Sequence, residues 1–130
     1  MANLIRISAE NSPPPSGHYS PGIVHNGVLY VSGQLPRVPG KLADFALPTI
    51  EEQTRQALAN AEAVLLAAGS RRDLVLRSTL YVSDIAHWAA INAEYAAFFG
   101  AHKPARAIVP VGRFKSGFLL EIDMIAAIAD

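Results

Sequence analysis

Asn26-Gly27 is the strongest turn signal in the chain, and it constrains the fold more than any other feature. The dipeptide separates two apolar runs, Gly22–His25 and Val28–Ser32. Asn and Gly supply the two positive-φ residues that a type I′ turn demands, so the two runs are predicted to pair as an antiparallel hairpin. The fold must therefore contain a sheet.

A helix is predicted to begin at Ile50. Thr49 is followed three residues later by Glu52, so each side chain can satisfy a backbone amide that is free at a helix start. Gly69 can adopt the left-handed conformation that ends a helix. Between these signals, apolar residues recur at three-to-four-residue spacing and form one stripe: Ile50, Ala57, Ala61, Val64, Leu65 and Ala68.

A second helix is predicted after Ser83 or Asp84, either of which can cap it. Gly100 offers its C-terminal stop. The helix would carry four large apolar residues on one face: Trp88, Ile91, Tyr95 and Phe98.

The remaining apolar segments are predicted to be strands: Leu4–Ser8, Leu74–Val82, Pro104–Val111 and Phe118–Ala126. The order is then a strand, a hairpin, a helix, a strand, a helix and two strands. This order favours an α+β fold in a single domain over residues 1–130, with a mixed six-stranded sheet and both helices on one face. The other sheet face also reads as apolar. Because 51% of the residues are hydrophobic and only 17% are charged, we expect subunits to associate through that face as a homo-oligomer.

Composition excludes several classes of function. Eleven basic and 11 acidic residues cancel, so no basic face for nucleic acid is expected. There is no cysteine, which removes disulfides, thiolate metal sites and thiol nucleophiles. The four histidines lack metal-ligand spacing, and no phosphate loop or dinucleotide fingerprint is present, so we expect neither a metal nor an organic cofactor. No signal peptide or membrane span is recognised, so a cytoplasmic protein is expected.

Arg106 lies in the otherwise apolar strand Pro104–Val111 and is the main clue to function. A half-buried cation requires an anion or hydrogen-bond acceptors, and the guanidinium fork fits a carboxylate bidentately. The alternative is an edge residue whose stem covers apolar surface. Glu121 in the last strand favours the first interpretation, because two opposite charges in neighbouring core-like strands indicate a polar site.

Three further positions are open to more than one interpretation. Ser32, at the end of the hairpin, is otherwise a turn or cap hydroxyl. Tyr19 is otherwise a loop aromatic that folds onto the core. Glu121 and Asp123 share one strand face, so one could face a site while the other pairs with Arg113 or Lys115.

Six segments, in order, resemble the reactive-intermediate deaminase (Rid) family, also called the YjgF family. They are Gly17-His18-Tyr19-Ser20-Pro21, Leu29-Tyr30-Val31-Ser32-Gly33-Gln34-Leu35-Pro36, Glu52-Gln53-Thr54-Arg55-Gln56-Ala57-Leu58, Asn92-Ala93-Glu94-Tyr95, Pro104-Ala105-Arg106 and Leu120-Glu121-Ile122-Asp123-Met124-Ile125-Ala126. The resemblance covers nearly the whole chain. It implies a chorismate-mutase-like fold and a homotrimer whose sheets form an inner barrel, with a ligand cleft at each subunit interface.

The resemblance also implies cofactor-free hydrolysis of 2-enamino or 2-imino acids to 2-keto acids and ammonia. Arg106 would grip the substrate carboxylate, and Glu121 would position or activate the attacking water. The remaining substrate-binding residues would be Tyr19, which closes over the cleft, Ser32 and Gly33, which orient the substrate, Asn92, which lines the cleft, and Ile108. Many members have a small polar residue or cysteine at the position of Ile108, so this pocket would be more apolar.

Two other functions compete with the deaminase. A non-catalytic module that binds a small carboxylate would use Arg106 equally well, but it would tolerate Glu121→Gln. A ribonuclease, an activity that has been attached to relatives, is disfavoured by the zero net charge and the single arginine pair, Arg71-Arg72.

Overall fold

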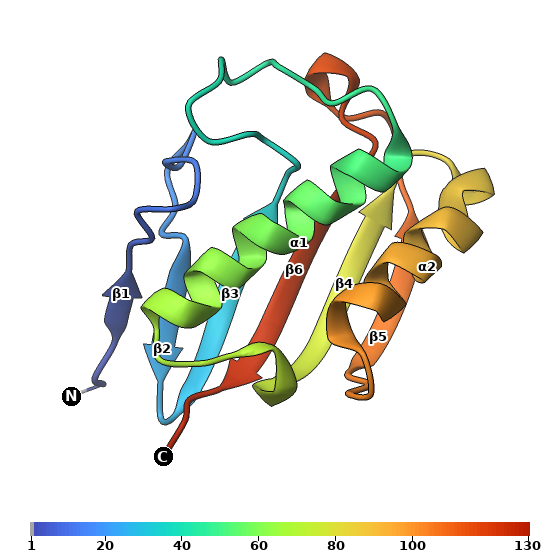
Figure 1. The fold of residues 1–130 in the computed structure, drawn as a ribbon. Helices are drawn as coiled ribbons and strands as arrows, with labels where there is room; N and C mark the ends of the chain where they lie inside the picture. The colour runs from blue at the N-terminus through green and yellow to red at the C-terminus, as the bar shows by residue number, and fades with distance from the viewer. Residues whose placement is uncertain (1) are drawn as a thin grey trace.

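Two helices lie over one face of a six-stranded sheet (Figure 1). The structure is a computed structural model that describes residues 2–130. The strands are β1 (Ile5–Ile7), β2 (Gly22–His25), β3 (Val28–Gln34), β4 (Val75–Val82), β5 (Ala105–Pro110) and β6 (Leu120–Ala127), and the helices are α1 (Ile50–Ala67) and α2 (Trp88–Phe99). The predicted α+β class, with a six-stranded mixed sheet and both helices on one face, is confirmed. Within residues 2–130 neither helix is long and apolar enough to cross a membrane.

The β2–β3 hairpin forms where the sequence predicts it. Asn26 and Gly27 have φ values of 50° and 76°, the left-handed pair that a type I′ turn requires. Strand β3 continues to Gln34, beyond the predicted end at Ser32. The last residues of β3, which include Ser32 and Gly33, therefore lie at the edge of a cavity.

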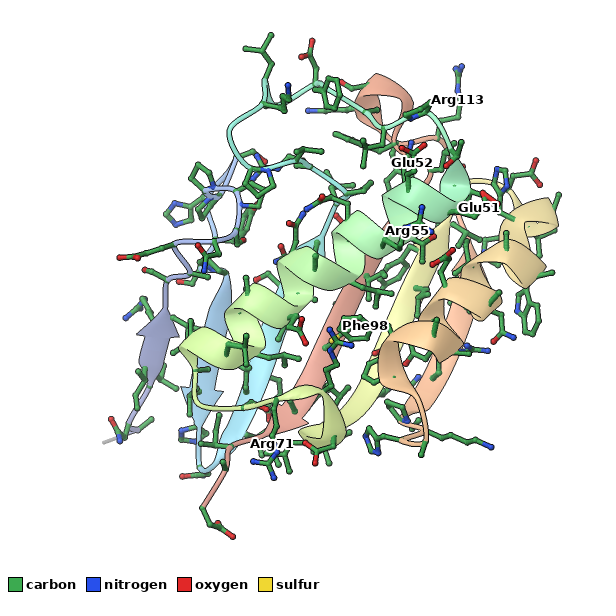
Figure 2. All side chains as sticks on the ribbon, in the orientation of Figure 1. Glu51, Glu52, Arg55, Arg71, Phe98 and Arg113 are labelled. Atoms are coloured by element: carbon green, nitrogen blue, oxygen red, sulfur yellow. The ribbon has the colours of Figure 1, made fainter. Side chains whose placement is uncertain are left out.

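Helix α1 begins at Ile50 with Thr49 as its N-cap. The Thr49 hydroxyl oxygen accepts a hydrogen bond from the Glu52 backbone amide at 3.1 Å. The hydroxyl also donates to the Glu52 carboxylate at 2.9 Å, so Glu52 contacts the cap side chain rather than the cap backbone amide. Glu51 and Glu52 occupy the first turn, where negative charge stabilises the helix (Figure 2). Gly69, with φ of 80°, follows the last turn.

Helix α2 is reached through a 3₁₀ turn, Ile85–His87. Asp84 caps that turn by accepting a hydrogen bond from the Ala86 amide at 2.9 Å. The predicted apolar stripe is only partly correct: Ile91 and Tyr95 are buried, but Trp88 is 42% exposed and Phe99 is buried in place of Phe98. The helix therefore packs on the sheet through its later turns and leaves the Trp88 indole accessible.

The strands that carry Arg106 and Glu121 are not neighbours, and the prediction that they are was wrong. The sheet order is β1-β2-β3-β6-β4-β5, so β4 separates β5 from β6. Helix α2 connects β4 to β5, which pair in parallel, while β6 returns antiparallel between β3 and β4. Arg106 consequently lies on an edge strand, and Glu121 lies near the middle of the sheet.

The core fills the space between the sheet and the two helices. Leu80, Leu120 and Ile122 on the sheet are fully buried, as are Val64 and Leu65 on α1. A salt bridge of 2.8 Å between Arg55 and Glu94 joins the outer surfaces of the two helices. Packing of these core residues thus determines which face of each strand points toward the helices.

The opposite face of the sheet has no helix over it (Figure 1). Tyr30 on β3 is 49% exposed there, and Val109 on β5 is 38% exposed. Tyr30 pairs with Ile125, and Val109 pairs with Tyr81, so apolar and aromatic side chains extend across several strands of this face. We refer to it below as the uncovered face.

Candidate active site

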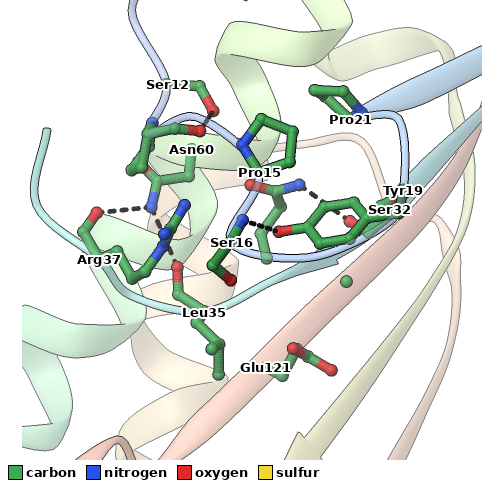
Figure 3. A pocket seen from close by; sticks show the side chains of 13 residues that line it. Ser12, Pro15, Ser16, Tyr19, Pro21, Ser32, Leu35, Arg37, Asn60 and Glu121 are labelled. Carbon is green, nitrogen blue, oxygen red and sulfur yellow. Dashed lines mark hydrogen bonds between the residues drawn. The ribbon is translucent and has the colours of Figure 1, made fainter. Parts of the chain in front are cut away.

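A cavity of about 390 Å³ opens where the Pro-rich loop, residues 8–21 between β1 and β2, meets the ends of β3 and β6 (Figure 3). Four of the predicted site residues line it together: Tyr19, Ser32, Gly33 and Glu121. Arg37 and Asn60, which the sequence analysis did not single out, also line it. We call this space the Glu121 cavity.

Gly33 and Glu121 approach each other so closely that any side chain at position 33 would displace the Glu121 carboxylate. A Cβ placed on Gly33 would lie 2.8 Å from Glu121 Cδ and 2.8 Å from Oε1. The backbone of β3 thus packs directly on the carboxylate. This close approach, and not a positive φ, explains the glycine.

Hydrogen bonds tie the Pro-rich loop to β3. Ser32 Oγ donates to the Ser20 carbonyl at 2.6 Å, and the Ser32 amide donates to the Pro21 carbonyl at 2.9 Å. Within the loop, the Ser16 amide donates to Tyr19 Oη at 3.3 Å (Figure 3). Ser32 therefore anchors the segment that carries Tyr19, which lies 44% exposed at the cavity wall.

Glu121 is a half-buried acid with an altered proton affinity. Burial, and then the charge of Asp123, raise the pKa of the Glu121 carboxyl above its usual value. Asp123 accepts a hydrogen bond from Tyr81 Oη at 3.0 Å. Within residues 2–130 no ion pair joins Asp123 to Arg113 or Lys115, so that possible pairing is not formed.

Arg106 lies in a second, separate group of residues. Its Nη1 donates to Asn92 Oδ1 at 2.8 Å, so Arg106 and Asn92 lie together. The guanidinium carbon is 4.9 Å from the Tyr95 ring centroid and 5.6 Å from that of Trp88. In the described part of the chain no acid forms an ion pair with Arg106, so one amide oxygen and two aromatic rings hold the cation.

A cavity of about 400 Å³ adjoins this second group and includes Asn92, Tyr95 and Arg106 in its wall. Ile108, two residues beyond Arg106, is partly buried against the hydrophobic core. It lines neither this space nor the Glu121 cavity.

The register of the sheet puts Arg106 and Glu121 on opposite faces. Arg106 pairs with Ser78, which is fully buried beneath the helices, so the guanidinium projects from the helix-covered face of the sheet. Glu121 alternates with the buried Leu120 and Ile122, so its carboxylate projects from the uncovered face. The two side chains of a single copy therefore lie on different sides of the sheet.

Sequence reasoning missed the roles of Trp88 and Tyr95, which it treated only as core residues. The sequence signal for these roles was the spacing of Trp88, Asn92 and Tyr95. They occupy positions i, i+4 and i+7, which share one helix face. That face meets Arg106. Among residues 2–130, no three acidic or histidine side chains cluster as metal ligands would.

Known proteins with related sequences and folds connect this site to a family. A family model described as Endoribonuclease L-PSP matches residues 9–128. A RutC family protein of Pyrococcus horikoshii is 41% identical, over 92% of this chain and 94% of its own. A 2-iminobutanoate/2-iminopropanoate deaminase of Salmonella typhimurium is 35% identical over the same shares of the two chains.

The fold comparison agrees with the sequence relatives. The crystal structure of Escherichia coli TdcF with bound serine superposes with a TM-score of 0.89 at 29% identity, covering 96% of this chain and 99% of that one. The chain therefore belongs to the endoribonuclease L-PSP family, which is the YjgF or Rid family.

Proposed function

We propose that this protein hydrolyses reactive 2-enamino and 2-imino acids to 2-keto acids and ammonia. The observation that carries the proposal is Arg106, a half-buried guanidinium that is held in place by Asn92 and has no acidic partner among residues 2–130. Such a cation is ready to accept a ligand carboxylate. The Salmonella relative named as an imine deaminase, and the relative with bound serine, support a small amino-acid-derived ligand.

The working site would be composed of two copies of the chain. Imino acids keep the carboxylate and the imine carbon on adjacent atoms, so the groups that bind them must lie within a few ångströms of each other. Arg106 and Glu121 project from opposite faces of one sheet, so Arg106 of one copy would meet Glu121 of the next. The apolar uncovered face, with Tyr30 and Val109 exposed, supports burial between copies, and we propose a homotrimer.

In the proposed reaction Arg106 binds the carboxylate bidentately and turns the imine carbon toward Glu121. The Glu121 carboxylate takes a proton from a water molecule as the water oxygen bonds to that carbon. Glu121 passes that proton to the nitrogen as the C=N double bond becomes a single bond, which gives a carbinolamine. Glu121 then takes the hydroxyl proton and delivers it to the nitrogen, so the C–N bond breaks, ammonia leaves and the oxygen becomes the keto oxygen.

Residues around Glu121 would orient the substrate for this attack. The Gly33 backbone packs on the carboxylate and restricts its position. Ser32 anchors the Tyr19 loop, and the tyrosine would cover the bound ligand. The raised pKa of Glu121 makes its carboxylate a stronger base than an ordinary glutamate, as proton abstraction from water demands.

Competition between the protein and semicarbazide for freshly formed imines tests the proposal. An amino acid oxidase generates each imine, and a deaminase lowers the rate of semicarbazone formation. We expect a strong effect from the wild type, none from Arg106→Ala and a loss on the order of 10²-fold for Glu121→Gln. A folded wild-type oligomer that leaves every rate unchanged contradicts the proposal. Carboxylate binding that needs Arg106 but is indifferent to Glu121→Gln would instead identify a binding module.

A further inference from the structure

Asp123 and Tyr81 form a polar pair beside Glu121 that the proposed reaction does not use. Asp123 is two residues beyond Glu121 on β6, so both carboxylates project from the uncovered face. Tyr81 on β4 pairs in register with Glu121 and belongs to the same face. Its hydroxyl reaches diagonally to Asp123 Oδ2 at 3.0 Å.

The hydrogen bond fixes the direction of the Asp123 carboxylate. A carboxylate that no hydrogen bond holds is otherwise free to turn away from a like charge. The bond to Asp123, followed by burial, raises the pKa of the Tyr81 hydroxyl, so the phenol remains a protonated donor. Tyr81 thus keeps a negative charge next to Glu121.

Within one copy of the chain, the other groups that face Glu121 come from β3 and the Pro-rich loop. In the proposed oligomer, Arg106 of the next copy faces it as well. Ser32 and Gly33 on β3 carry no titrating side chain near neutral pH. Tyr19 and Arg37 line the same cavity, and among residues 2–130 Arg37 is the only cation in its wall. The Arg37 guanidinium donates a hydrogen bond to the Pro14 carbonyl, which ties it to the loop. Asp123 is therefore the acid placed to oppose ionisation of Glu121.

We propose that Asp123, held by the Tyr81 hydroxyl, is a positioning residue whose charge increases the proton affinity of Glu121. The catalytic consequence rests on the proposed deaminase function, because a stronger base removes a proton from water more readily. The electrostatic coupling itself exists whether or not the protein turns over imines. The two claims can therefore be tested separately.

Carbon-13 NMR of the full-length protein tests the coupling directly. Glutamate labelled at the side-chain carboxyl carbon gives one signal per residue, and the signal missing from Glu121→Gln identifies Glu121. We expect its titration midpoint to move to lower pH in Asp123→Asn, and to move in the same direction by less in Tyr81→Phe. Tyr30→Phe is the matched control, since it removes a phenol from the same face and should leave the midpoint in place.

An unchanged Glu121 midpoint in both Asp123→Asn and Tyr81→Phe overturns the inference, whatever the enzymatic rates are. The pH profile of kcat/KM on imines then tests the consequence for the reaction. In Asp123→Asn we expect the acid limb to shift to lower pH while the plateau falls, because the base is weaker. A fall without a shift would show a merely structural role for Asp123. Failure to hydrolyse any imine would refute the proposed function but leave the NMR result decisive for the coupling.

Discussion

The side chains of Arg106 and Glu121 project from opposite faces of the sheet, and their strands are separated by β4. Each is the charged centre of its own group: Arg106 with Asn92 and two aromatic rings, Glu121 with Gly33 and the Tyr19 loop. The described wall of the cavity beside Arg106 contains no acid, and Glu121 lies on the other face of the sheet. The proposed function therefore depends on contact between copies of the chain.

Asn92→Asp should weaken binding of the substrate carboxylate. The new carboxylate would lie 2.8 Å from the Arg106 guanidinium, in the place of the present amide oxygen, and would pair with it inside the chain. We expect KM for imino acids to rise on the order of tenfold, equivalent to ~1.4 kcal/mol. Asn92→Ala is the comparison variant, because it removes the hydrogen bond without adding a competing charge. Equal KM values for wild type and Asn92→Asp would argue against carboxylate binding by Arg106.

Gly33→Ala should displace the Glu121 carboxylate at little cost to stability. The added Cβ would lie 2.8 Å from the far end of a flexible side chain, which can move aside. We expect kcat/KM to fall on the order of 10²-fold, since misplacement of a catalytic group by about 1 Å has that effect. Gly112→Ala is the matched control, because position 112 has open space around it. Full activity in Gly33→Ala would show that the reaction does not require the present position of Glu121.

Glu121 should make stability depend on pH in a defined direction. Its pKa is raised in the folded chain by burial and by Asp123, so the folded state holds the proton more tightly than the unfolded state. The contribution of Glu121 to stability is therefore present at low pH and is lost as pH rises through the raised value. Urea unfolding should show Glu121→Gln gaining stability relative to wild type as pH increases from acid to neutral. A difference that is constant with pH would contradict this.

Thr49→Ala should destabilise the fold by about 1 kcal/mol, the usual effect of losing an N-cap. The substitution removes both hydrogen bonds between Thr49 and Glu52, and it lies far from Glu121 in the chain. Thr49→Ser keeps the hydroxyl and should be close to wild type. Urea midpoints at constant slope measure the loss, and equal midpoints for the Ala and Ser variants would show that the cap contributes nothing.

Local signals in the sequence predicted local structure correctly. Asn26-Gly27 specifies its turn through backbone conformations that few other residues adopt, and Thr49 caps the helix that begins at the next residue. Both depend on residues a few positions apart. Family resemblance, and not a local signal, assigned Tyr19, Ser32, Gly33 and Glu121 to one site with Arg106, Asn92 and Ile108. The structure gathers only the first four around one cavity.

The order of the strands could not be deduced in that way. The segments of Arg106 and Glu121 follow each other in the chain, but the connection through α2 pairs β5 in parallel with β4, and β6 then occupies the place on the other side of β4. Which strands pair is decided by packing over the whole sheet. The exposed Trp88 has a similar explanation, because the entry through Ile85–His87 leaves the first turn of α2 off the core.

Mixed oligomers test the central claim most directly. Arg106→Ala and Glu121→Gln chains, each inactive alone, are co-expressed with different tags, and oligomers that contain both are isolated. In a cyclic trimer that contains both chains, one of the three interfaces places an intact Arg106 against an intact Glu121, so imine hydrolysis should recover to about a third of the wild-type rate. Mixed oligomers that stay as inactive as either parent would contradict a site shared between two copies of the chain.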